Sequence, residues 1–566
     1  MADVAELAPL DIGLPPKFAE YRQGQLDPAL DIVASDRRWQ YLSAPVGTGK
    51  SLTYMTVAKL MEARTLVLVG TKGLQTQLMD DFAAVGMHDV RGANNYPCIA
   101  LTPGGVLHGL GPERGSCDDG PCKAGVSCRL RPRKQRDGST WGGGCLYYDA
   151  REDASHSQIV VSNYAFWLSL ARGSDPLAIG KFDLLILDEA HTAPDWLADF
   201  CAIELQRKEV AELLEMNLPP LDEGVDVWVE WARKAAVIAN SRYADAQESL
   251  KDTFNTNRRN LVVRVMRLGK LSRSLDHLSR ARGWHNAEST ARDTKLPGME
   301  TDWVTQDLPD KQLYNPVWAH AYAEEFLFRS IPKVLLSSAT LSPEVGKYLG
   351  IPPKQSEWHE VRSAFNRKRR PFYICPIVRV DHRMTEQQIA LWVEHIDQII
   401  DTRVHLKGII HTVSYKRAQE LMSRSRHKHL MLTHDSRTSR ATIEKFKSSS
   451  KPCILVSPSV VEGFDFPYDE CRWQIIAKIP FSDGRDPVFK ARRTSDNNYG
   501  NYLASLAIMQ MTGRSTRAKD DASEVFVVDD HWGWFQSRIR WPKWFKESWE
   551  WVRQIPPPLD LNQWAK

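Results

Sequence analysis

The chain has 566 residues, of which 42% are hydrophobic and 25% are charged, the balance of a folded globular protein with more than one core. A net charge of +4 is small for this length, so any nucleic-acid surface must be a local patch. The sequence has no secretory signal and no apolar run near the roughly 20 residues that span a bilayer. We therefore expect a cytoplasmic protein with reduced thiols and no membrane partner.

Short, wholly apolar runs alternate with helical stretches along the chain. Such runs predict strands buried on both faces of a parallel sheet. They fall at 39–43, 66–69, 159–161, 184–187, 334–336, 408–410, 454–456, 475–479 and 525–528. Because they form one group before position 340 and another after 400, the predicted fold class is α/β with two domains.

Two segments interrupt the first group of strands. Residues 96–147 hold five of the nine cysteines among Gly, Pro and Asp without periodicity, which indicates a loop-rich module not held by a hydrophobic core. Residues 195–312 are charged and helix-like, and we predict no strand there. Both segments are therefore expected to be insertions into the first domain.

The strongest local motif directly follows the first predicted strand and opens a helical pattern. Its glycines let the backbone curl around phosphates, Lys50 reaches the β and γ oxygens, and the Ser51 hydroxyl can bind Mg²⁺. The motif predicts an ATP site formed by Ala44, Pro45, Val46, Gly47, Thr48, Gly49, Lys50 and Ser51. Ala44 replaces the first glycine of the usual P-loop consensus. A glycine-rich turn is the structural alternative.

A second motif, Asp188-Glu189-Ala190-His191, follows the strand predicted at 184–187. Asp188 is expected to position Mg²⁺, and Glu189 is expected to orient or deprotonate the attacking water. Either motif alone could be structural, but together and in this order they predict nucleotide hydrolysis.

The spelling Asp-Glu-Ala-His resembles superfamily 2 DNA helicases of the XPD/DinG type, and further motifs extend the resemblance over nearly the whole chain. Arg22 and Gln25 resemble the Q-motif that contacts adenine, 70–78 resembles motif Ia on the nucleic-acid strand, and 338–341 resembles motif III. Motif IV is similar to 411–415. Motif V is similar to 461–465, which includes Gly463 and Asp465, and motif VI to 510–517, which includes Gln510, Arg514 and Arg517.

An arginine supplied across the cleft from the P-loop stabilises charge in the transition state, which makes Arg514 and Arg517 the candidate fingers. With Lys50, Asp188, Glu189, His191 and Gln510 they complete the expected catalytic set. The alternative for such arginines is a solvated helix face.

The resemblance implies two RecA-like motor domains. Motor domain 1 would comprise 1–95, 148–194 and 313–345, with a cysteine-rich metal-cluster module at 96–147 and an arch-like helical insertion at 195–312. Motor domain 2 would comprise 346–566. The implied protein is a monomer of bacterial, phage or mobile-element type.

The implied activity is ATP-dependent unwinding, with 5′-to-3′ translocation on single-stranded and forked DNA. One alternative is a translocase that remodels R-loops, RNA–DNA hybrids or protein–DNA complexes without processive unwinding. Another is a non-catalytic assembly subunit, whose mark would be the loss of Lys50, Glu189 or Arg514, and all three are present.

The clustered thiols predict a metal site. Cys98 and Cys145 resemble the flanks of the iron–sulfur module of this family, and Cys117, Cys122 and Cys128 lie between them. A [4Fe–4S] cluster needs four thiolates, so one of the five is spare. Zn²⁺ is the alternative, because Cys₄ zinc sites use similar loops, although the spacing is wider than in zinc ribbons.

Basic residues gather at 258–282, where eight oppose a single acid, Asp276. A helix there would turn Leu261, Val262, Val265 and Leu268 inward and the cations outward, available to DNA phosphates or simply to solvent. A second basic run comprises Arg362 and 367–370. The tryptophans crowded at 532–551 are expected to pack the last helices.

Overall fold

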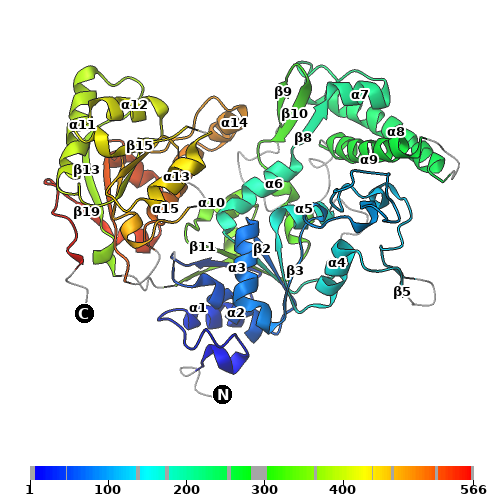
Figure 1. Cartoon of the computed structure of the whole chain (residues 1–566), viewed down its shortest axis with the longest axis horizontal. Coiled ribbons are helices and arrows are strands. Elements are labelled where there is room, and N and C mark those ends of the chain that lie inside the picture. The colour runs from blue at the N-terminus through cyan, green and yellow to red at the C-terminus, as the bar shows by residue number, and fades with distance from the viewer. Residues whose placement is uncertain are drawn as a thin grey trace.

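The computed structural model describes residues 7–45, 47–134, 140–171, 178–251, 257–281, 303–361, 366–435, 437–459, 464–516 and 520–561. Val46, Gly463, Arg517, Arg282 and Arg362 lie outside these ranges. Two seven-stranded sheets lie side by side (Figure 1). We call the residues packed around these sheets domain 1 and domain 2. None of the described helices is long and apolar enough to cross a membrane.

The first sheet is wholly parallel, and its strands alternate their side chains between two apolar layers. On one face, Leu42, Val67 and Ile186 pack against α1 (Leu26–Ala34), α2 (Lys50–Leu60) and α3 (Lys72–Phe82). The other face packs against α5 (Tyr164–Ala171) and α6 (Ala193–Cys201). The strand order is β12 (Ser356–Glu360), β1 (Trp39–Ser43), β11 (Lys333–Ser338), β7 (Leu184–Asp188), β2 (Thr65–Val69), β6 (Ile159–Asn163) and β3 (Met87–Asp89). Because β12 pairs with β1, domain 1 extends beyond residue 346, where motor domain 2 was expected to begin.

The second sheet is also parallel. Its order is β15 (Met431–Thr433), β16 (Ile454–Ser457), β14 (Gly408–His411), β17 (Trp473–Ile476), β18 (Glu524–Asp529), β13 (Phe372–Val378) and β19 (Trp549–Trp551). Helices α11 (Glu386–Asp401) and α12 (Tyr415–Arg424) cover one face, and α13 (Ser439–Ser448) and α15 (Tyr499–Thr512) the other. The nine predicted strands and the α/β fold class are confirmed.

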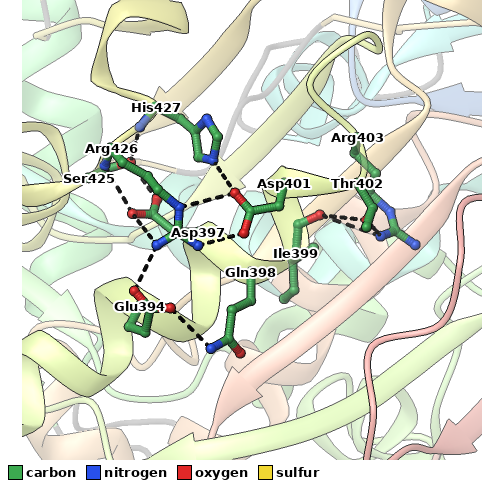
Figure 2. Close-up of polar contacts among 10 residues, drawn as sticks. All are labelled: Glu394, Asp397, Gln398, Ile399, Asp401, Thr402, Arg403, Ser425, Arg426 and His427. Atoms are coloured by element: carbon green, nitrogen blue, oxygen red, sulfur yellow. Dashed lines mark hydrogen bonds and ion pairs between the residues drawn. The ribbon is translucent and has the colours of Figure 1, made fainter.

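Polar contacts fix α11 at the rim of domain 2, as Figure 2 shows. Arg426, just after α12, donates 2.7 Å to Glu394 and 2.5 Å to Asp401, and the His427 ring lies 2.7 Å from Asp401. Arg403 follows α11 and is completely buried, where it donates 2.5 Å and 2.9 Å to one carboxylate oxygen of Glu524 on β18. Helix α11 is therefore tied to the residues that follow α12, and Arg403 just after it is tied to the sheet.

The cysteine module, residues 96–147, is built from loops, as predicted. The expectation that no hydrophobic core holds it was wrong, because Leu101, Leu107 and Val126 are buried in the same apolar cluster as one face of the first sheet. Its regular structure among the described residues is limited to the 3₁₀ turns Ile99–Leu101 and Pro121–Ala124, the short pair β4 (Arg133–Lys134) and β5 (Thr140–Trp141), and the start of α4 (Leu146–His156). The turn at Pro121–Ala124 packs against helix α9 of the second insertion. The two insertions therefore contact each other beside the first sheet.

The second insertion is the helical insert, residues 195–312. It contains α7 (Arg207–Leu214) and the long antiparallel pair α8 (Val225–Ser249) and α9 (Arg258–Ser279) (Figure 1). The prediction that it contains no strand was wrong. An antiparallel sheet orders β8 (Ile203–Gln206), β10 (Lys311–Pro316) and β9 (Trp303–Asp307), and β10 continues past residue 312. Strands β8 and β10 bury only alternate residues and β9 buries none fully, so their sequences carry no continuous apolar run.

Aromatic side chains form the core of the C-terminal part of domain 2. Trp532 and Trp541 are buried and pack, mostly tilted or edge-on, with Phe372, Phe545 and Trp549 around the last strands. The packing prediction for this tryptophan-rich region is confirmed for these residues. Trp551, in contrast, is 58% exposed.

Candidate active site and nucleic-acid interface

The phosphate loop joins β1 to α2. Gly47 and Gly49 adopt φ values of 76° and 80°, a left-handed conformation that disfavours any residue with a Cβ. Gly49 is the N-cap of α2, so the first backbone N–H groups of that helix and the side chain of its first residue, Lys50, lie together at the phosphate loop. This is the backbone geometry that binds phosphate oxygens.

Gln25 holds the phosphate loop through hydrogen bonds to its backbone carbonyls. Its buried side-chain amide donates 2.6 Å to the carbonyl of Thr48 and 3.1 Å to that of Gly49. Its own carbonyl accepts 2.6 Å from the Arg22 backbone, and the Arg22 guanidinium donates 2.5 Å to Gly47 O. Both predicted Q-motif residues therefore contact the loop.

The carboxylates Asp188 and Glu189 stand at the end of β7, next to the P-loop. Lys50 Nζ lies 3.0 Å from Asp188 Oδ1 and forms a second ion pair with Glu189. Burial raises the pKa of Asp188. Burial acts in the same direction on Glu189, but the charge and hydrogen bond of Lys50, with a hydrogen bond from Ser338, hold the pKa of Glu189 at about 2. Glu189 is therefore ionised and has a left-handed backbone, with φ of 49°.

A hydrogen-bonded chain leads from Glu189 into domain 2. Ser338 Oγ donates 3.1 Å to Glu189 Oε2, and the His191 ring nitrogen Nδ1 lies 2.9 Å from Ser338 Oγ. Gln510 Nε2 of α15 lies 2.9 Å from His191 Nε2. Burial lowers the pKa of His191 and favours a neutral ring, which accepts from Gln510 and donates to Ser338. The chain thus joins motifs II, III and VI across the two domains.

Arg514 follows α15. Its guanidinium donates 3.1 Å to Phe464 O and lies 3.9 Å from Asp465, so motifs V and VI are brought together. The two other residues expected in this region, Gly463 and Arg517, lie outside the described residues.

A groove of about 370 Å³ lies where domain 1 meets the cysteine module. It is flanked by the ends of β2 and β6. Amides, aromatic rings and two lysines line most of it, together with small residues, the Ser169 hydroxyl and one carboxylate, Asp118. They include Lys72, Asn94, Asn95, Lys123, Tyr147, Asn163, Phe166 and Trp196. Amide edges, π faces and cations are the groups that bind single-stranded nucleic acid. Motif Ia supplies Gly70 and Lys72, and Asn95 and Tyr147 lie in the sequences that resemble the flanks of the iron–sulfur module. No motif indicated the other residues of the groove.

The basic helix forms as predicted over most of 258–282, as α9, with Val262, Val265 and Leu268 buried. Arg267 does not face solvent alone, because it forms ion pairs with Glu209 and Glu212 of α7. Arg259, Arg264, Lys270, Arg273 and Arg280 are exposed. The helix therefore presents cations to solvent beside the cysteine module.

All five clustered cysteines line one small cavity of the cysteine module. Cys98, Cys117 and Cys128 are buried, and Cys122 and Cys145 are partly exposed. The hydrogen bond from Cys117, with a smaller contribution from the start of α4, lowers the pKa of Cys145 to about 6. Convergent thiols are the donor set for iron–sulfur or zinc, although no three His, Cys, Asp or Glu side chains of the described chain have metal-binding geometry.

A phosphate loop after β1, acidic residues at the end of β7 and an arginine just after α15 of a second parallel sheet define two RecA-like α/β domains around one nucleotide site. Family models match residues 17–216, described as the res subunit of type III restriction enzymes, and 400–548, described as a helicase C-terminal domain.

The relatives point the same way. The ATP-dependent DNA helicase DinG of Escherichia coli K12 is 22% identical over 68% of this chain, and the chain spans 65% of DinG. The ATP-dependent DNA helicase YoaA of the same organism is 21% identical over 90% of this chain and 91% of YoaA. A solved XPD helicase superposes with a TM-score of 0.56 at 13% identity, over 94% of this chain and 99% of its own. The resemblance to superfamily 2 helicases of the XPD/DinG type is therefore confirmed.

Proposed function

We propose that this chain is an ATP-dependent DNA helicase of the DinG/XPD type that translocates 5′ to 3′ on single-stranded DNA. The observation that carries the proposal is the chain Glu189–Ser338–His191–Gln510, which connects the hydrolytic carboxylate to the second domain. Through this connection, a change at the γ-phosphate can be converted into a movement of one domain against the other.

The positions of the described residues support the following roles, and the role of Arg517 rests on its motif alone. The α2 N-terminus and Lys50 bind the phosphates, while ionised Glu189 orients the attacking water and accepts its proton. As Lys50 turns to the phosphates, Glu189 loses its closest cation, so its pKa rises towards the range useful for a base. Arg514 and Arg517 would stabilise charge in the transition state from domain 2.

The Ser51 hydroxyl and the Asp188 carboxylate supply the hard oxygen donors that Mg²⁺ prefers. Bound Mg²⁺ would neutralise charge on the β and γ oxygens. Asp188 is held next to the phosphate loop by its contact with Lys50, so both donors lie beside the same loop.

Strand displacement tests the helicase proposal. With ATP, the protein should unwind a duplex with a 5′ single-stranded tail and leave a duplex with a 3′ tail intact, and Lys50→Ala should abolish both ATP hydrolysis and unwinding. DNA-stimulated hydrolysis without displacement would instead favour the translocase that remodels R-loops or protein–DNA complexes. Absence of hydrolysis in the wild type would leave only the assembly-subunit alternative.

The groove at the cysteine module is the proposed path of the DNA strand. Lys72 is exposed at its edge, so Lys72→Ala should weaken single-stranded DNA binding and reduce its salt dependence. Lys451→Ala, at an exposed lysine of domain 2 that does not line the groove, is the matched control for fluorescence anisotropy. Equal affinities for both variants would remove the strand from this groove.

We further propose that the cysteine cavity binds a [4Fe–4S] cluster through four of its five thiols, with Zn²⁺ as the alternative. Anaerobically purified protein should contain about four irons per chain, and Cys145→Ser should lose them. Cys453→Ser, a cysteine of domain 2 away from the cavity, should retain them. Stoichiometric zinc in a colourless sample would decide for the alternative.

A further inference from the structure

The corner between α14 (Pro487–Ser495) and α15 is the place where domain 2 is joined to domain 1 by two separate ion pairs. One ion pair reaches the start of α6, just after the Asp-Glu-Ala-His motif, and the other reaches the end of α10 (Pro343–Tyr348). None of the motifs in the sequence includes these residues.

The first ion pair is formed by Arg492 of α14. Its Nη1 lies 3.1 Å from Asp195 Oδ1 on α6, and its Nε donates 2.7 Å to the carbonyl of Val317. The guanidinium also lies 5.4 Å from the centre of the Trp318 ring and donates 2.8 Å to the Tyr499 hydroxyl. The side chain of Arg492 is only 12% exposed, so its guanidinium is largely enclosed by these interdomain contacts.

The second ion pair is formed by Asp496, between the two helices. Its Oδ2 accepts 2.8 Å from Lys347 Nζ and 2.7 Å from the Tyr348 hydroxyl, both on α10. Burial raises the pKa of Asp496, but these two donors outweigh burial and leave the pKa below its usual value. The carboxylate is therefore charged and, like Arg492, is bound to domain 1.

Aromatic rings fill the space between the two ion pairs. Trp318 stacks on Tyr348 at 4.6 Å and meets Tyr499 edge-on at 5.2 Å. Tyr348 also contacts Tyr502 of α15, and Trp318 donates 2.8 Å to Ser495. Two rings from each domain thus form a packed contact, which fixes the orientation as well as the distance of α15.

Helix α15 connects this interdomain contact to the ATP site. From Tyr499 to Gln510 it rises about 17 Å at 1.5 Å per residue, so a rotation at its start displaces its end. Gln510 contacts His191, four residues before Asp195 on the other side of the interface. The helix therefore meets domain 1 at both of its ends.

We propose that Arg492 and Asp496 form an interdomain clasp, which seats the start of α15 on domain 1 and thereby sets the reach of Gln510 and Arg514 to the ATP site. Arg492 and Asp496 are positioning residues, since they contact neither the phosphate loop nor the carboxylates of Asp188 and Glu189. The proposal rests on ATP hydrolysis by this cleft, as proposed above. It predicts that both ion pairs control the rate of turnover, whereas ATP binding depends on the P-loop of domain 1.

Charge reversal tests the clasp. Asp195→Arg places two cations together, and Lys347→Glu places two anions together; each should lower kcat for DNA-stimulated hydrolysis about tenfold and change KM for ATP less than about twofold. The exchanges Asp195→Arg with Arg492→Asp, and Lys347→Glu with Asp496→Lys, should recover part of the lost rate, which measures the coupling within each pair. Arg493→Asp, at an exposed neighbour on α14, is the matched control.

The outcomes separate the clasp from the proposed function. If the wild type hydrolyses ATP and reversal of either pair leaves kcat unchanged, the clasp is overturned while the helicase proposal stands. Loss of kcat with no recovery in either exchanged pair, or with an equal loss in Arg493→Asp, also overturns it. Tyr348→Phe, which removes one hydrogen bond to Asp496 and keeps the ring, covers the case of a misfolded reversal variant and should lower kcat about threefold. An unchanged kcat in Tyr348→Phe would contradict the clasp.

Discussion

Replacing Gly49 by Ala tests the construction of the phosphate loop most directly. Gly49 has φ of 80° and ψ of 44°, and a residue with a Cβ in this left-handed region costs about 1–2 kcal/mol. The added Cβ would also lie 2.6 Å from Gln25 Nε2, so the amide must move away. That movement threatens its hydrogen bonds to Thr48 and Gly49, each worth about 0.5–1.5 kcal/mol.

The two effects together amount to about 2 kcal/mol or more, which corresponds to at least about thirtyfold weaker ATP binding. Isothermal titration calorimetry with ATP and Mg²⁺ measures this change. Gly533→Ala is the matched control, because a Cβ at Gly533 meets open space and its φ is not positive. An affinity of Gly49→Ala within about threefold of the wild type would refute the reasoning, since the loop would then bind without its left-handed glycine.

Three further predictions concern charged groups. Arg403→Met should lower the free energy of unfolding in urea by about 3–5 kcal/mol because it leaves buried Glu524 unpaired, and a loss below about 1 kcal/mol would contradict this. The hydrogen bond to Asp529 raises the pKa of His531 in the folded protein. The stability lost in His531→Asn should therefore be greatest below the ordinary histidine pKa and vanish as pH rises through the folded pKa. Thermal unfolding of both proteins from pH 5.5 to 9 measures this, and a difference that does not change with pH would contradict it. Arg267→Ala should leave DNA affinity in anisotropy within about twofold of the wild type, because its guanidinium is already paired within the insert; a large loss would make it a phosphate contact.

The sequence was most informative where strands are buried on both faces. The run at 184–187 predicted β7 because a central parallel strand needs apolar residues at every position. Strand β10 was missed because only its alternate residues are buried and the polar Lys311, Gln312 and Asn315 interrupt the apolar pattern. Strand β12 was missed for a similar reason, since it lies at the sheet edge and carries charged and polar residues.

The same distinction holds at the candidate site. Gln25 and Lys50 stand in motifs with short, fixed spacing, and the structure brings both to the phosphate loop. Arg492 and Asp195 meet across nearly 300 positions, and one arginine or aspartate among many carries no local pattern. Such a pair is defined only by the packing of two domains, which the sequence pattern does not specify.

The two insertions leave the first sheet and return to it without changing the order of its strands. Strand β7 ends at Asp188 and its neighbour β11 begins at Lys333, so their pairing must close a loop of about 145 residues. The length-dependent part of the entropy cost of closing such a flexible loop is about 4 kcal/mol, which slows the pairing of these strands. An insert that has already folded brings its ends together in advance. The helical insert is therefore expected to fold before the sheet that carries it, and its separately expressed helices α8 and α9 become the first place to look for early structure in refolding.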